Sequence, residues 1–184
     1  MDQLKYIRLL IIIGFVSLCG LHLCSQRPLW LDETFVLRNI EALNYGQLFG
    51  PLEPAQSFPR VYLVIVKWTG SFFHNHVVAL RLLSFIFMLS AFLVWKRLYE
   101  RHCEGETEPL TLLLFSWVSS YWLVYYAAEL KPYSMDVLAA GLFAVYFFKQ
   151  REYTARAPSA GLIWGALLLP FLLFFSYTAI FFFW

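Results

Sequence analysis

Two adjacent carboxylates, Asp32 and Glu33, have the residue types and spacing that catalysis can use. They lie in the segment LWLDET, residues 29–34, next to Trp30. At a membrane surface, partial desolvation and a second acid would shift the pKa of one carboxyl, and a shifted carboxyl can serve as a general base. The pattern also suits a helix start, with Asp32 as the N-cap and Glu33 as a first-turn acid favoured by the helix dipole. The spacing alone leaves both interpretations open.

A second polar motif, ELKPY, occupies residues 129–133. An acid such as Glu129 can position an acceptor or assist proton transfer, and Lys131 can bind a lipid phosphate. Pro132 suits the first position of a helix, where its missing N–H costs nothing, and Tyr133 beside it is a candidate substrate contact. The alternative is that Glu129 and Lys131 merely snorkel and anchor a helix end.

Two arginines are further candidates for substrate contacts. Arg81 lies inside the outer end of an apolar segment, so it must face protein, a cavity or headgroups. A lipid phosphate or simple helix packing would satisfy it equally well. Arg60 and Lys67 belong to a shorter apolar segment and suit anionic headgroups.

The elements that carry these residues are expected to lie in a membrane. Of the 184 residues, 60% are hydrophobic and 14% are charged, and the mean hydropathy is +0.62. A bilayer core of roughly 30 Å requires about 20 apolar residues per helix. The clear candidates are residues 6–24, 77–95, 110–126, 132–148 and about 159–184. The aromatic residues 121, 122, 125 and 126 are more typical of a membrane belt than of a sugar platform.

A sixth apolar segment, residues 61–73, decides the topology. It is about 20 Å long as a helix and has Lys67 in its middle. Lys and Arg near spanning ends prefer the cytoplasmic side. If this segment does not span, the basic residues on that side are Lys5, Arg8, Lys96, Arg97, Arg101, Lys149, Arg151 and Arg156. If it does span, two of these three clusters move outside, so the non-spanning topology is favoured.

The predicted fold is therefore an all-α integral membrane protein with about five transmembrane helices. Residues 1–184 form a single transmembrane domain, and residues 25–76 form a long outer loop with two interfacial juxtamembrane helices, 33–45 and 61–73. The expected location is a cell (inner) or organellar membrane. Both polar motifs then face the non-cytoplasmic side.

The order of these features resembles a known family. The segments LWLDET, QSFPRVYLVIVKW, ALRLLS and YYAAELKPYSMDVLAA are similar to the protein O-mannosyltransferase and aminoarabinose-transferase branch of the GT-C membrane glycosyltransferase superfamily. The resemblance covers most of residues 29–148. The family's long first outer loop with two juxtamembrane helices agrees with the topology above.

The resemblance implies transfer of a sugar from a polyprenyl-phosphate-type carrier, with inversion at the anomeric carbon. Asp32, with Glu33 as the alternative, would activate the acceptor as a base. Glu129 would orient acceptor or donor, and Lys131 would stabilise the departing phosphate. Relatives often have arginine at that position, so Lys131 keeps the charge and loses the bidentate fork.

The expected partners are a lipid-linked sugar donor, membrane lipids and an acceptor that the sequence does not identify. A nucleic-acid partner is not expected, because the formal net charge of +2 is spread thinly. We also expect no tightly bound metal, because the chain has no DxD motif and its histidines lack ligand spacing. Some relatives use a divalent metal, which leaves that option open.

Two other functions fit parts of the sequence. The chain stops at Trp184 inside an apolar run, whereas the family has further helices, so the chain is expected to be the N-terminal portion of such a module. A non-catalytic derivative, or a subunit of a larger membrane assembly, is therefore the main alternative. A transporter is less favoured, because the middle of each expected span is mostly Leu, Phe, Val and Ile.

Overall fold

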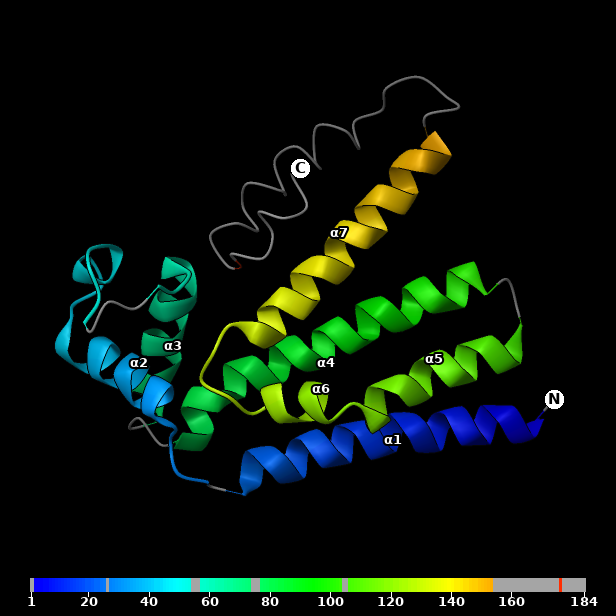
Figure 1. The fold of residues 1–184 in the computed structure, drawn as a ribbon, viewed down its shortest axis with the longest axis horizontal. Coiled ribbons are helices and arrows are strands. Elements are labelled where there is room, and N and C mark those ends of the chain that lie inside the picture. Colours follow the sequence, from blue (N-terminus) through cyan, green and yellow to red (C-terminus); the bar gives the residue numbers. More distant parts are fainter. Residues whose placement is uncertain are drawn as a thin grey trace.

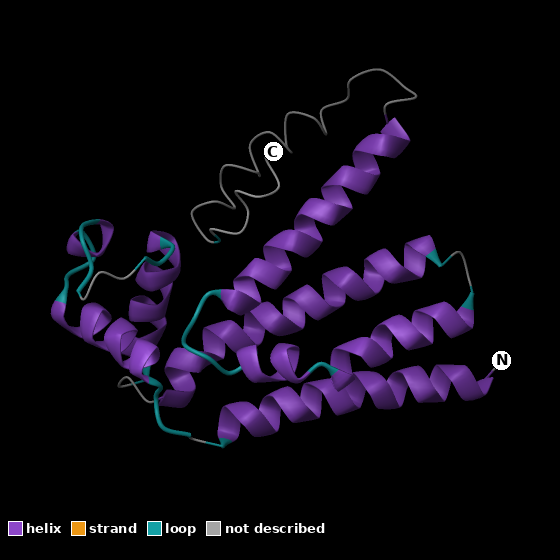
Figure 2. Cartoon of the chain, viewed as in Figure 1, coloured by secondary structure: helices purple, strands orange, loops and turns teal. Residues whose placement is uncertain are grey.

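The computed structural model of the chain describes residues 2–25, 27–53, 57–73, 77–103, 106–153 and 176. Within these ranges the chain forms helices and no strand (Figure 2). The helices of the main bundle are α1 (Asp2–Cys24), α4 (Val77–His102), α5 (Thr107–Ser119), the short α6 (Tyr121–Tyr126) and α7 (Tyr133–Tyr153). A smaller unit of α2 (Leu31–Ala42), the 3-10 helix η1 (Gln47–Phe49) and α3 (Arg60–Phe72) lies at one end of these helices (Figure 1).

Two of the described helices, α1 and α4, are long and apolar enough to cross a membrane. The other described helices do not meet the same criterion. α5 has 13 residues and would span only about 20 Å, while α7 has 21 residues but carries Asp136 in its first turn and charged residues near its end. The expected span 159–184 lies outside the described residues apart from Ser176.

The expected continuous helix over residues 110–126 is wrong. The helix is broken at Ser120, whose backbone is extended with φ −79° and ψ 105°, so that α5 ends at Ser119 and α6 starts at Tyr121. The Ser120 side chain accepts a hydrogen bond from the Leu123 N–H at 3.5 Å, as serine does at helix starts. After the break, α6 lies beside the part of α4 that is nearer α2 (Figure 1).

Both segments that were expected to form interfacial helices are helical, with shifted ends. α2 begins at Leu31 and stops at Ala42, because Leu43 is extended with ψ 138°, and α3 runs over Arg60–Phe72. The facing sides of these helices share one hydrophobic core with η1 and the start of α4. Its buried members include Val36, Ile40, Leu48, Tyr62, Leu63, Val66 and Leu80. This core joins α2 to α3, and α3 to the start of α4.

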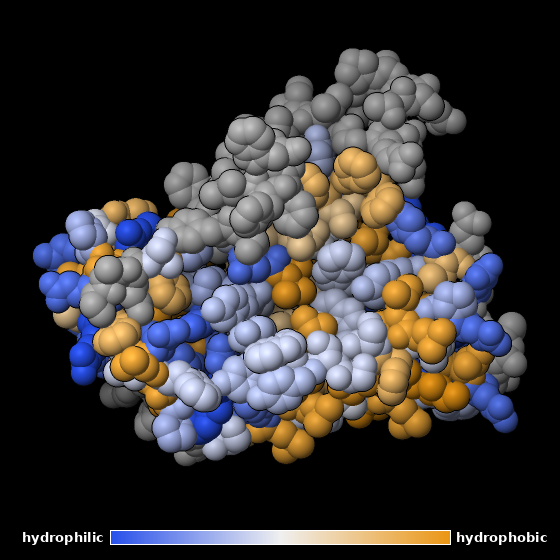
Figure 3. Space-filling view, in the orientation of Figure 1, coloured by the Kyte–Doolittle hydropathy of each residue, from blue (hydrophilic) through white to orange (hydrophobic). Residues whose placement is uncertain are grey.

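The bundle has a second core and an apolar exterior. Phe15 of α1, Phe92 of α4 and Trp117 of α5 pack ring against ring, with centroids 4.9–5.6 Å apart. The outer faces of α1 and α5 expose large apolar side chains, among them Leu9, Leu10, Leu21, Leu112 and Phe115. These faces form much of the orange surface along the bundle in Figure 3. An apolar exterior of this kind suits lipid contact.

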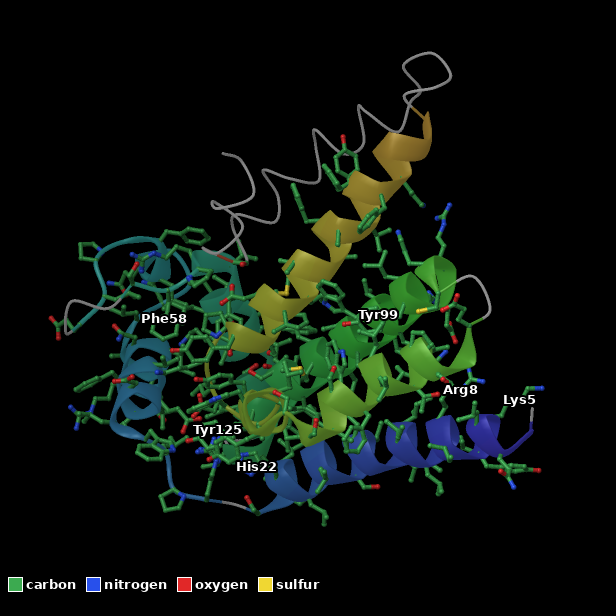
Figure 4. The ribbon with its side chains drawn as sticks, turned by 45° about the vertical axis from the view of Figure 1, so that its right-hand side comes forward. Lys5, Arg8, His22, Phe58, Tyr99 and Tyr125 are labelled. Carbon is green, nitrogen blue, oxygen red and sulfur yellow. The ribbon has the colours of Figure 1, made fainter. Side chains whose placement is uncertain are left out.

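Several basic residues lie at the end of the bundle away from α2. Lys5 and Arg8 lie at the start of α1, and Tyr99 marks the nearby end of α4, whereas His22 and Tyr125 lie at the other end (Figure 4). Arg101 and His102 are in the last turn of α4. Other basic residues, among them Arg27, Arg81 and Lys131, lie at the α2 end, so the expected sidedness stays a prediction.

Helices α4 and α7 make a close contact at Gly141. A Cβ at this position would lie 2.8 Å from Nε1 of Trp95 and 3.1 Å from a methyl carbon of Val94. The Trp95 indole is itself held, because its Nε1–H donates to the Val137 carbonyl oxygen at 3.1 Å. Small residues allow such close approach between membrane helices.

Replacing Gly141 by alanine is expected to lower the free energy of unfolding by about 1–3 kcal/mol, since the added methyl group overpacks this contact. Unfolding of the purified chain in detergent measures the change. Gly20→Ala is the control, because nothing lies within 4 Å of a Cβ at Gly20. An equal loss in both variants would contradict the prediction.

Candidate functional site

A buried ion pair between α2 and α4 lies behind the site. Glu33 and Arg81 have side chains that are 0% exposed. Arg81 Nε donates to Glu33 Oε1 at 3.0 Å, and Nη2 donates to Oε2 at 2.6 Å. This bidentate geometry is the strong form of an arginine–carboxylate contact.

Glu33 also accepts two backbone hydrogen bonds. The Trp30 N–H donates to Oε2 at 3.0 Å, and the Leu130 N–H donates to Oε1 at 2.7 Å. Burial acts to raise the pKa of Glu33, but the bonds from Arg81, Leu130 and Trp30 outweigh it, and the pKa lies below its ordinary value. Glu33 is therefore an ionised residue that joins α2, α4 and the α6–α7 turn.

Asp32 is not the N-cap that one interpretation of its motif predicted. The N-cap is Trp30, so that Asp32 and Glu33 both lie in the first turn of α2. The helix starts earlier because the Glu33 carboxylate reaches back to the Trp30 N–H. Asp32 consequently does not cap the helix, and its carboxylate contacts Lys131.

Asp32 meets Lys131 across the end of the bundle. Lys131 Nζ lies 2.6 Å from Asp32 Oδ2, although the two residues are 99 positions apart. The Asp32 side chain is 59% exposed and that of Lys131 is 16% exposed. Burial acts to lower the pKa of Lys131, but the hydrogen bond that Lys131 donates to Asp32 and the nearby charges of Tyr133 and Asp32 outweigh it, and the pKa is raised. Lys131 is therefore charged at neutral pH.

Glu129 is held by Arg27, which follows α1. Arg27 Nη2 lies 3.4 Å from Glu129 Oε1 and donates to the Ala128 carbonyl oxygen at 3.0 Å. Its Nη1 donates to the Tyr125 hydroxyl at 2.9 Å, and its guanidinium lies 4.5 Å from the centre of the Tyr125 ring. Burial raises the pKa of Glu129 above its ordinary value, although Tyr125 and Arg27 oppose the shift. Of the two buried acids, Glu33 and Glu129, only Glu129 has a raised pKa.

These groups surround a pocket of about 400 Å³. Its charged lining residues are Asp32, Glu129 and Lys131. The rest of its lining is almost wholly aromatic and comprises Trp30, Leu31, Tyr121, Trp122, Tyr125, Tyr126 and Tyr133. Carboxylates and an ammonium beside aromatic faces can bind a ligand that carries hydroxyls, C–H faces and a negative group.

Neighbouring rings hold this aromatic wall in place. Trp122 and Tyr126 stack with centroids 5.5 Å apart, Tyr121 and Tyr125 stack at 5.4 Å, and the Tyr126 and Tyr133 centroids are 4.5 Å apart. The pocket wall thus extends from α6 to the start of α7.

A comparison of the chain with protein-family models, curated proteins and solved structures finds no match.

The structure brings together four of the seven site residues that the sequence indicated. Asp32, Glu129, Lys131 and Tyr133 line the pocket, whereas Glu33 lies behind it.

The two arginines proposed as substrate contacts lie away from the pocket lining. Arg81 is buried against Glu33 and donates to the carbonyl oxygens of Arg27 and Pro28 at 2.9 and 3.3 Å. Of the two interpretations that the sequence left open for Arg81, this position fits helix packing. An arginine inside an apolar helix needs acceptors, and Arg81 finds them within the protein. Arg60 donates to the Leu48 carbonyl oxygen at 3.3 Å, in the α2–α3 unit.

Sequence reasoning missed Arg27 and undervalued the aromatic residues of α6. A signal for Arg27 existed, because in the expected topology a basic residue directly after the first spanning helix opposes the usual charge preference and needs a partner. The α6 rings gave no such signal, since their pattern equally fits a membrane belt. Among the described residues, no group of three His, Cys, Asp or Glu could hold a metal ion, and the expected absence of a tightly bound metal stays a prediction.

Proposed function

We propose that this chain is a membrane glycosyltransferase module that transfers a sugar, with inversion, from a polyprenyl-phosphate-type lipid donor to an acceptor in this pocket. The observation that carries the proposal is the meeting of an exposed carboxylate, Asp32, and an ammonium, Lys131, at 2.6 Å within an aromatic-lined pocket. A base and a cation for phosphate in one aromatic pocket are the groups that this reaction requires.

Asp32 is the better candidate for the base. Glu33 already binds Arg81 and two backbone N–H groups, so a proton on it would disrupt a buried ion pair. Asp32 is largely exposed and its partner Lys131 faces the same pocket. Glu33 is then a positioning residue that holds the first turn of α2 against the turn carrying Lys131.

In the proposed step, the acceptor transfers a proton to the Asp32 carboxylate while its nucleophilic atom bonds to the anomeric carbon. The bond from that carbon to the phosphate oxygen breaks, and its electron pair leaves with the lipid phosphate. The phosphate becomes one charge more negative, and a fixed ammonium at Lys131 stabilises that charge more than water would.

The aromatic wall and the charge distribution support the remaining parts of the proposal. Aromatic faces at Trp122 and Tyr126 can pack against the C–H face of a sugar ring, and Glu129 orients its hydroxyls. We further propose about five spanning helices and a non-cytoplasmic active face, because Lys5, Arg8 and Arg101 lie at the ends of α1 and α4 that are away from the pocket.

The alternative function is a non-catalytic membrane protein, or assembly subunit, that binds a related ligand. One observation favours it. Both acids that line the pocket are already paired, Asp32 with Lys131 and Glu129 with Arg27. A pocket whose charges satisfy one another can bind without reacting.

Replacing Lys131 by methionine is expected to lower sugar transfer about 10²-fold, as loss of one stabilising group for a developing anion does. The assay follows radiolabelled sugar from polyprenyl-phosphate donors in membranes that carry the chain. Lys149→Met is the control, because Lys149 is exposed near the far end of α7. A folded parent without transfer from any donor in a panel would favour the non-catalytic alternative.

A further inference from the structure

The charges of the pocket conflict with its proposed ligand. Its lining has two carboxylates, Asp32 and Glu129, against one ammonium, Lys131. Arg27 offsets Glu129 from outside the lining. An anionic phosphate must therefore bind at Lys131, yet this ammonium already contacts Asp32 Oδ2 at 2.6 Å.

Lys131 has little spare capacity for a second anion while Asp32 is bound. Its ammonium also lies 3.5 Å from the Tyr133 hydroxyl and 5.3 Å from the centre of the Tyr133 ring. The Lys131 side chain is only 16% exposed, so its open directions are few. A phosphate oxygen at hydrogen-bond distance from Nζ would also lie close to the Asp32 carboxylate, and like charges repel strongly at such range.

Asp32 can leave this contact more easily than Lys131 can. The Asp32 side chain is 59% exposed, so water can replace Lys131 around it, and half-exposed ion pairs contribute little stability. Glu129 cannot move in the same way, because Arg27 and Tyr125 hold it. Glu33, the neighbouring acid on α2, cannot move either, because Arg81 holds its carboxylate.

We propose that Asp32 and a phosphate group compete for Lys131, so that phosphate binding releases the Asp32 carboxylate into the pocket. This inference rests on the proposed function for its phosphate ligand. The ion pair then acts as a latch, in which the base is freed only when the donor phosphate occupies Lys131. An unoccupied pocket keeps its base paired.

The latch makes an unusual prediction for the Asp32→Asn variant. Removing the competing charge should strengthen phosphate binding, whereas an aspartate that itself bound the ligand would weaken binding when lost. The dissociation constant for phosphate is expected to fall about threefold or more, the scale of a partly exposed ion pair. Glu41→Gln, an exposed change on the same helix outside this pocket, should leave the constant unchanged.

The experiment titrates the full chain in neutral phosphatidylcholine nanodiscs with sugar-free polyprenyl phosphate. Inorganic phosphate and polyprenol without phosphate form two further arms. Lys131→Gln and the double variant Asp32→Asn/Lys131→Gln complete a cycle, and the latch requires that Asp32→Asn gives no gain once Lys131 is lost. Size-exclusion profiles of every variant verify that it is folded.

Tighter binding by Asp32→Asn in a phosphate arm, dependent on Lys131, supports the latch. A gain with the lipid alone identifies a lipid phosphate as the ligand, and a gain with inorganic phosphate identifies the phosphate group itself. A gain for polyprenol, or unchanged or weaker phosphate binding by Asp32→Asn beside a binding parent, overturns the latch but not the proposed function. If neither parent nor variant binds any phosphate, the proposed function fails and the latch fails with it.

Discussion

Replacing Arg81 by methionine is expected to lower the free energy of unfolding by about 3–5 kcal/mol, the usual result of leaving one partner of a buried ion pair alone. Glu33 would keep its charge in a site that is 0% exposed, or would take up a proton. The carbonyl oxygens of Arg27 and Pro28 would also lose their donor. Denaturant unfolding of the purified chain in detergent measures this loss.

A double variant separates the ion pair from the packing of the arginine stem. If the pair dominates, Glu33→Gln/Arg81→Met should be less destabilised than the sum of the two single variants, because neither charge is then left alone. Strict additivity would mean that Arg81 acts through packing and through its bonds to the loop after α1.

The Arg81→Met effect should depend on pH. The pKa of Glu33 in the folded protein lies below its ordinary value of 4.5, so its ion pair adds stability that is complete above that value. This stability is lost as the pH falls through the folded pKa. The difference between parent and Arg81→Met should therefore shrink below pH 4.5, where the lone carboxyl of the variant is protonated. A constant difference across that range would show that the Glu33 charge is not its source.

Replacing Asp32 by asparagine is expected to lower sugar transfer about 10²- to 10⁴-fold, the usual loss when a general base is removed. Asparagine matches aspartate in shape but cannot accept the acceptor's proton. The stability of the chain should change little, because Asp32 is mostly exposed. Initial rates at saturating donor, with unfolding measured on the same preparation, give both quantities.

The control for this loss is Glu41→Gln, which removes the same charge from α2 outside the pocket. If Asp32→Asn retained full activity while Glu129→Gln lost it, the base would be Glu129, whose raised pKa also suits proton transfer. That result would reassign the proposed roles within the same pocket.

The helical class and the two polar motifs could be predicted from the sequence. Apolar runs of membrane length located α1 and α4, although they missed the first four residues of α1 and the last seven of α4, because hydropathy over about 20 residues is a strong signal. The broken helix at Ser120 could not be seen in that way. Hydropathy averages over a window, whereas a break depends on one serine whose backbone is extended.

The different environments of Asp32 and Glu33 also could not be predicted from the sequence. Sequence spacing identified Asp32 and Glu33 together but could not separate them, since adjacent residues of a helix point in different directions and only the neighbours decide their chemistry. Arg81 draws Glu33 into the core, and Lys131 holds Asp32 at the pocket. The ion pair between Glu33 and Arg81 forms only because the fold brings the first turn of α2 beside α4.

By itself, the sequence determined that the chain is helical, rich in membrane-length apolar segments, and equipped with acids and a lysine in two motifs. These properties follow from composition and short-range periodicity. Only the tertiary structure decided that Asp32 and Lys131, 99 residues apart, share an aromatic pocket while Glu33 does not. A contact at that separation depends on how helices pack, and packing is set by many side chains at once rather than by any local pattern.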